Sequence, residues 1–349
     1  MKPFRVLVVD DSAYSRRTIS KMLDCMEQIE VVGYAADGEE GIRQVISLKP
    51  DLVTVDLEMP RMDGFTLLRI LTTRFNIPVI VISALNEAEK VFRALEMGAL
   101  DFVAKPQRGN TPELRSIEQD LAQKVRNVLA SRKKTATEDS GEVATAVIPP
   151  RSLRQGRRNA VELVAIAAST GGPPALQSIF SGYDQSYNFG IVVAQHMPAG
   201  FTWAFAERLD RVSPFEVREA ADGDLVRPGL ALIAPGGKNM VLETVGAEVM
   251  VRITLPTAED RYLPSADRLF ASCAPIYGKR MMAVVLTGMG NDGKEGIIKV
   301  KEHGGVVLAE SESSAVVYGM PREAAATGCV DRIVPLPGIS KSILDCGGY

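Results

Sequence analysis

The sequence predicts an α/β fold divided between two domains, the first a parallel sheet wrapped by helices and the second a doubly wound, mostly parallel sheet. The chain has 349 residues and is 46% hydrophobic, which is enough to form two cores. Short β-branched runs alternate with helical patterns, as is typical of parallel strands joined by helices. This alternation stops in residues 131–160, which are polar, basic and interrupted by Pro and Gly, as in a linker. We therefore expect domains at residues 1–130 and 161–349.

The first domain has polar residues at the ends of its strand-like runs. Five runs are predicted strands: RVLVVD, VVGYAA, DLVTVD, IPVIVIS and DFVAK. Asp10 and Asp11 end the first run, Asp56 the third and Ser83 the fourth, and Lys105 follows the fifth. Because the carboxyl ends of parallel strands meet at one edge of a sheet, we expect these side chains to lie close together.

Three carboxylates at one edge need a cation, because like charges in one site disfavour joint ionisation. Mg²⁺, which prefers oxygen ligands, is the natural partner. Asp56 could then act as a nucleophile toward a phosphoryl group, while Lys105 offsets negative charge and Ser83 offers a hydroxyl. Each aspartate taken alone is better explained as a helix N-cap or a solvated turn residue, so the hypothesis depends on all five positions.

These residues resemble the receiver domain of two-component response regulators over essentially residues 4–130. The matching segments are VVDDS, VDLEMPRMDG, VIVIS and DFVAKP. The resemblance implies a flavodoxin-like (βα)5 fold and phosphorylation of Asp56 by a partner histidine kinase. It also implies a Mg²⁺ ion held by Asp10 or Asp11, by Asp56 and by the backbone carbonyl of Glu58. Coupling to the rest of the protein is expected through the switch residues, which are Ser83, Phe102 and Lys105.

The second domain has one serine, one histidine and one aspartate that each follow a predicted strand. Ser169 follows ELVAIAA, His196 follows FGIVVAQ and Asp292 follows MMAVVLTG. A serine hydroxyl needs a base and the base needs an orienting partner, so the three form a functional set. The Gly and Pro residues after Ser169 indicate a turn into a helix, whose N-terminus favours a developing oxyanion. Singly, each residue is better explained in another way: Ser169 as a helix cap, His196 as a hydrogen-bonded turn residue and Asp292 as a cap of the helix that begins near Lys294.

The order Ser, His, Asp differs from that of the α/β-hydrolases, and the sequence has no GxSxG elbow. The other histidine, His303, lies late in a helical segment before a glycine. A histidine in that position commonly bonds the terminal carbonyls of the helix, so we do not expect it to be catalytic.

Nearly all of residues 161–336 resembles, in order, the catalytic domain of the chemotaxis protein-glutamate methylesterase family, CheB. The matching runs are ASTGG, AQHMP, FTWAFAERL, EAADGD, APGG, LPSADRLF, LTGMGNDG and VVYGMP. The resemblance implies that Ser169 is the nucleophile, His196 the general base and acid, and Asp292 the orienting carboxylate. We also expect Thr170 and Met289 to contribute to the oxyanion hole.

The family resemblance also implies the substrates and the control of the enzyme. The substrates would be methyl-accepting chemoreceptors, whose glutamate γ-methyl esters are hydrolysed and whose glutamines are deamidated without a cofactor. Phosphorylation of the receiver domain would activate this reaction during chemotactic adaptation. Two positions depart from the family pattern: Ala167 stands where glycine is usual and Asn239 where histidine is usual. We expect Ala167 to tighten the turn and Asn239 to alter a substrate contact.

Composition argues against several other classes of protein. No stretch approaches the roughly 18 apolar residues of a membrane span, so membrane insertion is not expected. Four cysteines without metal-type spacing suit a reducing cytoplasm. From residue 161 onward 16 basic residues face 21 acidic ones, which argues against nucleic acid binding.

Two competing functions remain at this stage. A non-enzymatic adaptor would only bind receptors in response to phosphorylation, and ester hydrolysis by the purified protein distinguishes it from an enzyme. A receiver-controlled transcription factor would show salt-sensitive DNA binding.

Overall fold

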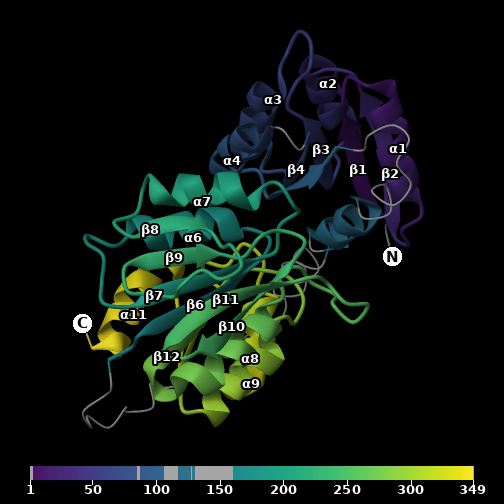
Figure 1. Ribbon diagram of the computed structural model, residues 1–349. Coiled ribbons are helices and arrows are strands. Elements are labelled where there is room, and N and C mark those ends of the chain that lie inside the picture. The colour runs from purple at the N-terminus through teal and green to yellow at the C-terminus, as the bar shows by residue number, and fades with distance from the viewer. Residues whose placement is uncertain (1–2, 85–86, 106–116, 127, 130–159, 349) are drawn as a thin grey trace. The chain divides into compact units, whose positions relative to one another are not determined.

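A computed structural model of the chain describes residues 3–84, 87–105, 117–126, 128–129 and 160–348. The chain divides into two compact units, Met1–Val143 and Ala144–Tyr349 (Figure 1). The predicted linker at residues 131–160 lies outside the described residues, apart from Ala160. None of the described helices combines the length and the apolar character that crossing a bilayer requires.

The first unit contains a five-stranded parallel sheet in the order β2-β1-β3-β4-β5. This is the flavodoxin-like order, so the predicted fold is confirmed. Its strands are β1 (Phe4–Val9), β2 (Ile29–Ala35), β3 (Leu52–Asp56), β4 (Val79–Ser83) and β5 (Asp101–Ala104). Its helices are α1 (Ala13–Asp24), α2 (Gly38–Leu48), α3 (Gly64–Ile70), the π-helix η1 (Leu71–Phe75) and α4 (Ala88–Glu96). Residues 117–126 and 128–129 are also helical.

Apolar residues of the strands and helices form the core of this unit. Helix α1 and the helical residues 117–126 share a cluster with β1, β3, β4 and β5 that includes Val6, Leu23, Ile80 and Leu121. Three helices begin with a side chain that accepts a backbone N–H of the first turn: Ser12 for α1, Asp37 for α2 and Asp63 for α3. The strand order reverses between β1 and β3, which is where such sheets place their ligands.

The second unit contains a seven-stranded sheet in the order β14-β13-β12-β6-β7-β9-β8. All neighbouring pairs in this sheet are parallel, as the alternating pattern predicts. Its strands are β6 (Leu163–Ala168), β7 (Gly190–Gln195), β8 (Glu216–Glu219), β9 (Leu230–Ile233), β12 (Met281–Val285), β13 (Val306–Glu310) and β14 (Arg332–Val334). A separate antiparallel hairpin joins β10 (Asn239–Val245) to β11 (Glu248–Thr254).

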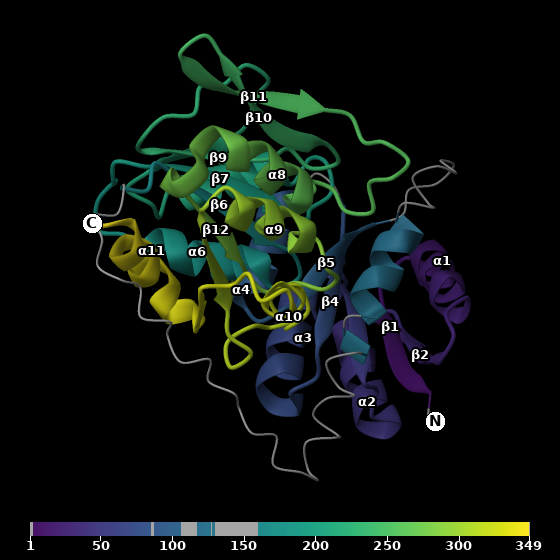
Figure 2. The same ribbon diagram turned by 90° about the horizontal axis from the view of Figure 1, so that it is seen from below.

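Helices cover both faces of the seven-stranded sheet. Figure 2 shows α8 and α9 on one side of the sheet and α6 and α11 on the other. Helix α7 packs on β8, β9 and α6, α10 packs on α9, β12 and β13, and the hairpin packs on α8. The helices are α6 (Gly172–Ser181), α7 (Thr202–Asp210), α8 (Ala266–Tyr277), the 3₁₀ turn η3 (Gly278–Arg280), α9 (Lys294–Glu302), α10 (Met320–Ala326), the 3₁₀ turn η4 (Leu336–Gly338) and α11 (Ile339–Gly347).

The connections reverse direction between β6 and β12. From β6 the chain proceeds to β7, β8 and β9 on one side, whereas β12, β13 and β14 lie on the other. Ligands of open α/β sheets bind beyond the carboxyl ends of the strands at such a reversal. The predicted Ser169 and Asp292 follow the two strands that flank it, and His196 follows β7.

Candidate functional site

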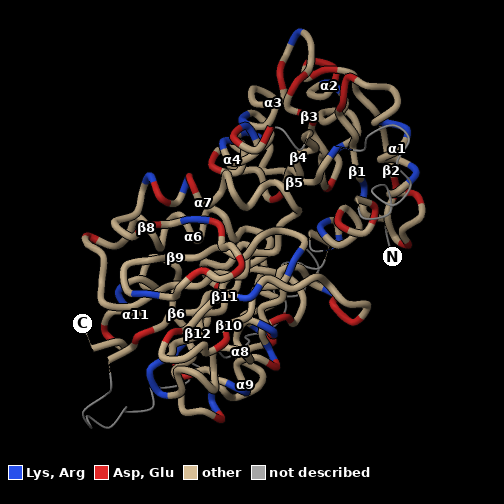
Figure 3. Tube along the Cα trace, viewed as in Figure 1, with Lys and Arg blue, Asp and Glu red and all other residues tan. Residues whose placement is uncertain are grey.

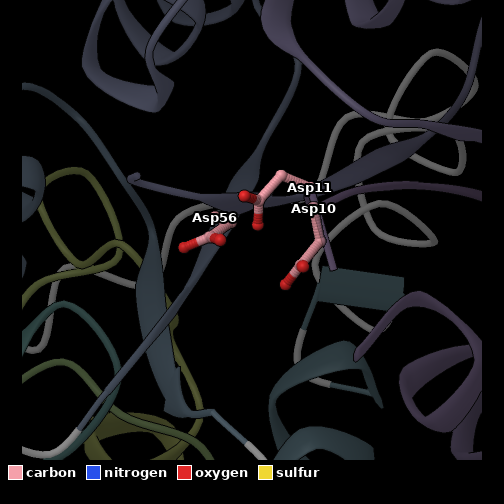
Figure 4. A group of neighbouring side chains, drawn as sticks. All are labelled: Asp10, Asp11 and Asp56. Atoms are coloured by element: carbon pink, nitrogen blue, oxygen red, sulfur yellow. The ribbon is translucent and has the colours of Figure 1, made fainter. Parts of the chain in front are cut away.

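Asp10, Asp11 and Asp56 form a cluster at the carboxyl edge of the first sheet. Each offers a carboxylate oxygen that lies within 4.8 Å of the others. Figure 4 shows the three side chains grouped at the strand ends, Asp10 and Asp11 after β1 and Asp56 on β3. Asp10 and Asp56 are buried, whereas Asp11 is exposed. The sequence therefore correctly predicts that these residues meet.

The electrostatics of the cluster suit a divalent cation. Burial, reinforced by Asp56, raises the pKa of Asp10 to about 6. Burial also raises the pKa of Asp56, although Lys105 bonds to it and opposes the shift. The buried Oδ2 of Asp10 accepts no hydrogen bond and has Lys105 Nζ at 3.4 Å. Carboxylate oxygens are ligands that Mg²⁺ prefers, and the single ammonium group of Lys105 does not satisfy all of those in this cluster. These residues therefore fit the ion.

The remaining predicted residues of this domain lie on β4 and β5 or just after β3. Ser83 is buried at the end of β4, and its hydroxyl donates to Glu87 Oε2 at 2.9 Å. Phe102 is buried on β5, with Lys124 Nζ 4.8 Å from its ring centroid. The backbone N–H of Glu58 donates to Asp56 Oδ1 at 3.4 Å, while its carboxylate pairs with Lys90. No local pattern in the sequence indicates that Glu87 accepts the hydrogen bond of the Ser83 hydroxyl.

Ser169 lies in the turn between β6 and α6, as predicted. Its N–H donates to the carbonyl of Thr287 at 3.0 Å, and its carbonyl accepts from Gly172 N at 2.7 Å. Gly171 has φ +78°, a left-handed conformation that glycine adopts without strain, and it precedes the first residue of α6. A Cβ atom on Gly288 would lie 2.7 Å from Ser169 Cβ. Because Gly288 has no side chain, the segment after β12 can lie directly against the serine.

His196 and Asp292 meet directly, although 96 residues separate them in sequence. His196 Nε2 lies 2.7 Å from Asp292 Oδ2. The N–H of His196 donates to the carbonyl of Ala168, so His196 also lies beside the residue that precedes Ser169. Both Ser169 and His196 belong to the described residues, and no hydrogen bond joins the serine hydroxyl to the imidazole. Such contacts often form only once substrate is bound.

Helix α8 supplies most of the hydrogen bonds to Asp292. Oδ1 accepts from the Ser265 hydroxyl at 3.1 Å and from Asp267 N at 3.0 Å, and Oδ2 accepts from Ala266 N at 2.7 Å. Burial by itself would raise the pKa of Asp292, but His196 and these backbone N–H groups hold it below its ordinary value. A carboxylate is favoured at a helix N-terminus, so α8 keeps Asp292 ionised beside the imidazole.

The structure also bears on the other explanation of Asp292, that it caps the helix α9. The capping of α9 was the competing explanation for this aspartate, but the N-cap of α9 is Gly293, which has φ +91° and no capping side chain. Asp267, in the first turn of α8, has a pKa raised to about 6, mainly by burial, and Asp292 contributes to the shift. The Asp292 carboxylate therefore caps α8, which precedes it in the chain, and not α9, which follows it.

Two residues that support His196 were missed in the sequence analysis. The ring of Tyr262 stacks on the imidazole, with centroids 5.0 Å apart and planes inclined by 7°. Gln195, which is 2% exposed, donates from Nε2 to the carbonyls of both Ser169 and His196 at 3.0 Å. The sequence shows Gln195 next to His196 in the AQHMP run. Its bond to Ser169 could not be predicted, because it depends on how the strands β6 and β7 pair.

Thr287, which follows β12, connects the serine turn to the end of β13. Its hydroxyl donates to the carbonyl of Thr170 at 2.9 Å and accepts from Val317 N at 3.0 Å. Its N–H donates to Glu310, a fully buried carboxyl group whose pKa burial raises. These bonds hold the turn on which the oxyanion prediction depends. The roles of Thr170, which is buried, and of Met289, next to Gly288, stay predictions.

The structure corrects both expectations about the departures from the family pattern. Ala167 lies inside β6 and pairs with Ala194 and Val285, so its methyl group is part of the core and does not tighten the turn. Asn239 is fully buried at the start of β10, so it cannot contact a substrate. The exposed His303 ends α9 and bonds the carbonyl of Lys299 at 2.9 Å, as predicted.

Charge is distributed in small groups of both signs. Along the described trace, Figure 3 shows Lys and Arg interspersed with Asp and Glu in each of the two units. This agrees with the sequence, in which neither domain is basic, and it offers no support for the transcription-factor alternative.

Comparisons with known proteins agree with the geometry. Residues 164–343 match the model of the CheB methylesterase family, and residues 6–116 match the response regulator receiver domain. A protein-glutamate methylesterase/protein-glutamine glutaminase of Geobacter sulfurreducens is 54% identical, over 99% of this chain and 98% of that protein. One from Myxococcus xanthus is 47% identical, over 97% of this chain and 95% of that protein.

A solved structure resembles the second unit. The crystal structure of the Thermotoga maritima CheB methylesterase catalytic domain covers 54% of this chain and 99% of its own, with 37% identity and a TM-score of 0.52. Full-length similarity to the curated relatives, together with both domain matches, shows the family. The chain belongs to the CheB methylesterase family of enzymes, with a response regulator receiver domain in its N-terminal part.

Proposed function

We propose that this protein hydrolyses glutamate γ-methyl esters, and deamidates glutamines, on methyl-accepting chemoreceptors during chemotactic adaptation. Ser169, His196 and Asp292 carry out the reaction, and phosphorylation of Asp56 by a histidine kinase activates it. The observation that carries the proposal is the His196–Asp292 bond beside the Ser169 turn, at the reversal point of the sheet. The domain limits 1–130, 131–160 and 161–349 belong to this proposal, as does a cytoplasmic location, which the scattered cysteines support.

The bond between His196 and Asp292 supports an assignment of the imidazole nitrogen that serves the serine. Nε2 faces the carboxylate, and an ionised carboxylate can only accept, so Nε2 carries the proton. The lone pair is therefore on Nδ1, which is the nitrogen that takes the Ser169 proton. Asp292 then stabilises the imidazolium that forms, without itself becoming protonated.

The reaction follows from these positions in two stages. Ser169 Oγ attacks the γ-carbonyl carbon while its proton moves to His196, and the carbonyl oxygen becomes an oxyanion near the N-terminus of α6. The C–O bond to the methoxide breaks, and His196 returns the proton so that methanol leaves. Water, deprotonated by His196, then attacks the acyl-enzyme and releases glutamate. For a glutamine substrate the leaving group is ammonia.

Activation begins at the carboxylate cluster of the receiver domain. Asp10, Asp11 and Asp56 would hold Mg²⁺, with the Glu58 carbonyl as a further ligand. When bound, the ion supplies positive charge for the phosphoryl oxygens. Asp56 is the nucleophile that accepts the phosphoryl group, Lys105 offsets its charge, and Ser83 must leave Glu87 before its hydroxyl can bond the new phosphoryl oxygen.

Methanol release from membranes that contain methylated chemoreceptors tests the proposed function directly. The purified chain should release methanol, and release should rise when Mg²⁺ and a small phosphodonor are added. Removal of Mg²⁺ with a chelator should abolish the rise. If the protein binds the receptors but releases no methanol under any of these conditions, the adaptor function is correct instead.

The Asp56→Asn variant is expected to lose the response to phosphodonor. An amide cannot act as the phosphoryl acceptor, so neither phosphoprotein nor an increase in methanol release should be detected. Phosphate incorporation and methanol release are measured together. Asp24→Asn, at the exposed end of α1, is the matched control and should respond like the natural protein. A normal response in Asp56→Asn would move the phosphorylation site elsewhere.

Loss of the Tyr262 ring is expected to lower turnover moderately. Because the ring stacks on His196, the Tyr262→Leu variant should lose about two- to tenfold in kcat, as the worth of an aromatic pair suggests. Tyr262→Phe keeps the ring and loses only the hydroxyl, which is bonded to the backbone of Asn291. It should therefore retain most of the activity. An equal loss in the two variants would assign the effect to the hydroxyl.

A further inference from the structure

Asn239 has no exposed surface, yet both ends of its side-chain amide form hydrogen bonds. Oδ1 accepts from Ser265 N at 2.8 Å, and Nδ2 donates to Asp260 Oδ2 at 3.1 Å. The two partners lie 26 and 21 residues further along the chain. One buried side chain therefore ties the start of β10 to two separate points of the segment that precedes and begins α8.

The first connection leads to Asp292. Ser265 is the N-cap of α8, and its hydroxyl donates to Asp292 Oδ1 at 3.1 Å. The next two residues of the helix donate their backbone N–H groups to the same carboxylate. Since Asn239 holds the N–H of Ser265, it fixes the position of the helical turn that binds Asp292.

The second connection leads to the face of the imidazole. Asp260 also accepts from Thr257 N at 2.7 Å and from Arg268 Nε at 2.6 Å, which closes the loop between β11 and α8. Burial opposes ionisation of Asp260, but these donors hold its pKa below the ordinary value. Tyr262 lies two residues after Asp260 and stacks on His196. Asn239 is thus linked to both supports of the imidazole: Asp292, which bonds its Nε2 edge, and Tyr262, which stacks on its face.

We propose that Asn239 is a positioning residue for the His196–Asp292 pair and acts through Ser265 and Asp260 without touching the substrate. The inference rests on the proposed hydrolysis and adds a positioning residue to the site proposed for that reaction. Asparagine suits the position because it combines one acceptor, needed by the Ser265 N–H, with one donor, needed by the Asp260 carboxylate. Aspartate has the same shape but offers no donor when ionised, and it would place a second negative charge against Asp260.

The test compares the full-length Asn239→Asp variant with the natural protein and with Glu243→Gln. Glu243 lies on the same strand, but its partner is Arg252 on β11, away from the pair. We expect Asn239→Asp to lower kcat by about tenfold to a hundredfold, because small displacements of catalytic groups have effects of that size. The KM should be unchanged, and Glu243→Gln should behave as the natural protein does.

A spectroscopic readout separates positioning from a general loss of stability. The proton between His196 Nε2 and Asp292 should give a downfield NMR resonance in the natural protein, and this resonance should shift or disappear in Asn239→Asp. A normal kcat, an increase in KM alone, or an unchanged resonance in a folded variant would overturn the proposal. If Asn239→Asp does not fold, Ser265→Ala, which removes the hydroxyl bond to Asp292 together with the α8 cap that accepts from Arg268 N, must show the same loss of resonance.

The readouts also distinguish this proposal from the proposed function. If the natural protein released no methanol, the hydrolysis would be wrong, whereas the resonance would still report whether Asn239 holds the His196–Asp292 pair.

Discussion

The Ser169→Ala variant is expected to lower methanol release from methylated receptors by on the order of 10⁴- to 10⁶-fold, by analogy with other triads. Without the hydroxyl there is no acyl-enzyme, and His196 can only assist the attack of water on the ester. The turn itself should persist, because its bonds to Thr287, Gly172 and Gln195 all use the backbone of residue 169. Receptor binding should therefore survive while turnover is lost.

Ser178→Ala is the matched control for this experiment. Ser178 lies on α6, which begins just after the turn that contains Ser169, and its side chain is exposed. The substitution there removes the same hydroxyl group and should leave turnover within about twofold, as expected for a surface position. Near-normal turnover in Ser169→Ala would exclude this serine as the nucleophile and leave the domain assignment without a mechanism.

The sequence predicts the placement of the site well because the relevant signals are local. In parallel sheets, a polar residue directly after an apolar run must lie at the carboxyl edge, as Ser169 and His196 do, and Asp292 lies in the turn that follows β12 at the same edge. The same reasoning succeeds for Asp56 at the end of β3 and for Ser83 at the end of β4. No knowledge of strand order is needed for any of these predictions.

The supports of the site could not be predicted in the same way. Tyr262 and Ser265 belong to the segment between β11 and α8, and their contacts with His196 and Asp292 depend on how that segment folds back on the sheet. The run LPSADRLF does contain a helix-start signal at Ser265. Nothing local indicates that the N–H groups of that helix bind an aspartate 27 residues away.

The two incorrect expectations have a shared physical cause. Ala167 and Asn239 depart from the family pattern next to the serine turn and to the APGG segment, and both expectations extend the role of the neighbouring motif to these side chains. Both side chains are fully buried, so each acts through packing or hydrogen bonding inside the domain. Nearness in sequence to a motif does not distinguish a side chain that faces the substrate from one that faces the core.

The Asp292→Asn variant is expected to lower turnover by about 10⁴-fold, as the same change does in other Ser-His-Asp sites. The carboxylate accepts five hydrogen bonds, and an amide nitrogen cannot accept any of them. If the nitrogen replaces Oδ2, His196 Nε2 and Ala266 N lose their acceptor. If it replaces Oδ1, the Ser265 hydroxyl and the backbone N–H groups of Asp267 and Gly293 lose theirs.

This substitution should therefore destabilise the domain as well as inactivate it. An unsatisfied buried donor costs about 1–3 kcal/mol, so the free energy of unfolding should fall measurably in a denaturant titration at neutral pH. Glu295→Gln, an exposed acid-to-amide change in the first turn of α9, should leave both properties nearly unchanged.

The pH dependence of stability tests whether the charge of Asp292 is responsible. The pKa of Asp292 is below its ordinary value in the folded protein, because His196 and the α8 N–H groups outweigh burial. Its ionisation therefore contributes stability that is fully present above the unfolded pKa of about 3.9 and is lost as the pH falls through the folded value. The difference in unfolding free energy between the natural protein and Asp292→Asn should be constant at neutral pH and shrink in acid. A difference that stayed constant down to the acid transition would mean that lost packing, and not the carboxylate held between α8 and His196, accounts for the effect.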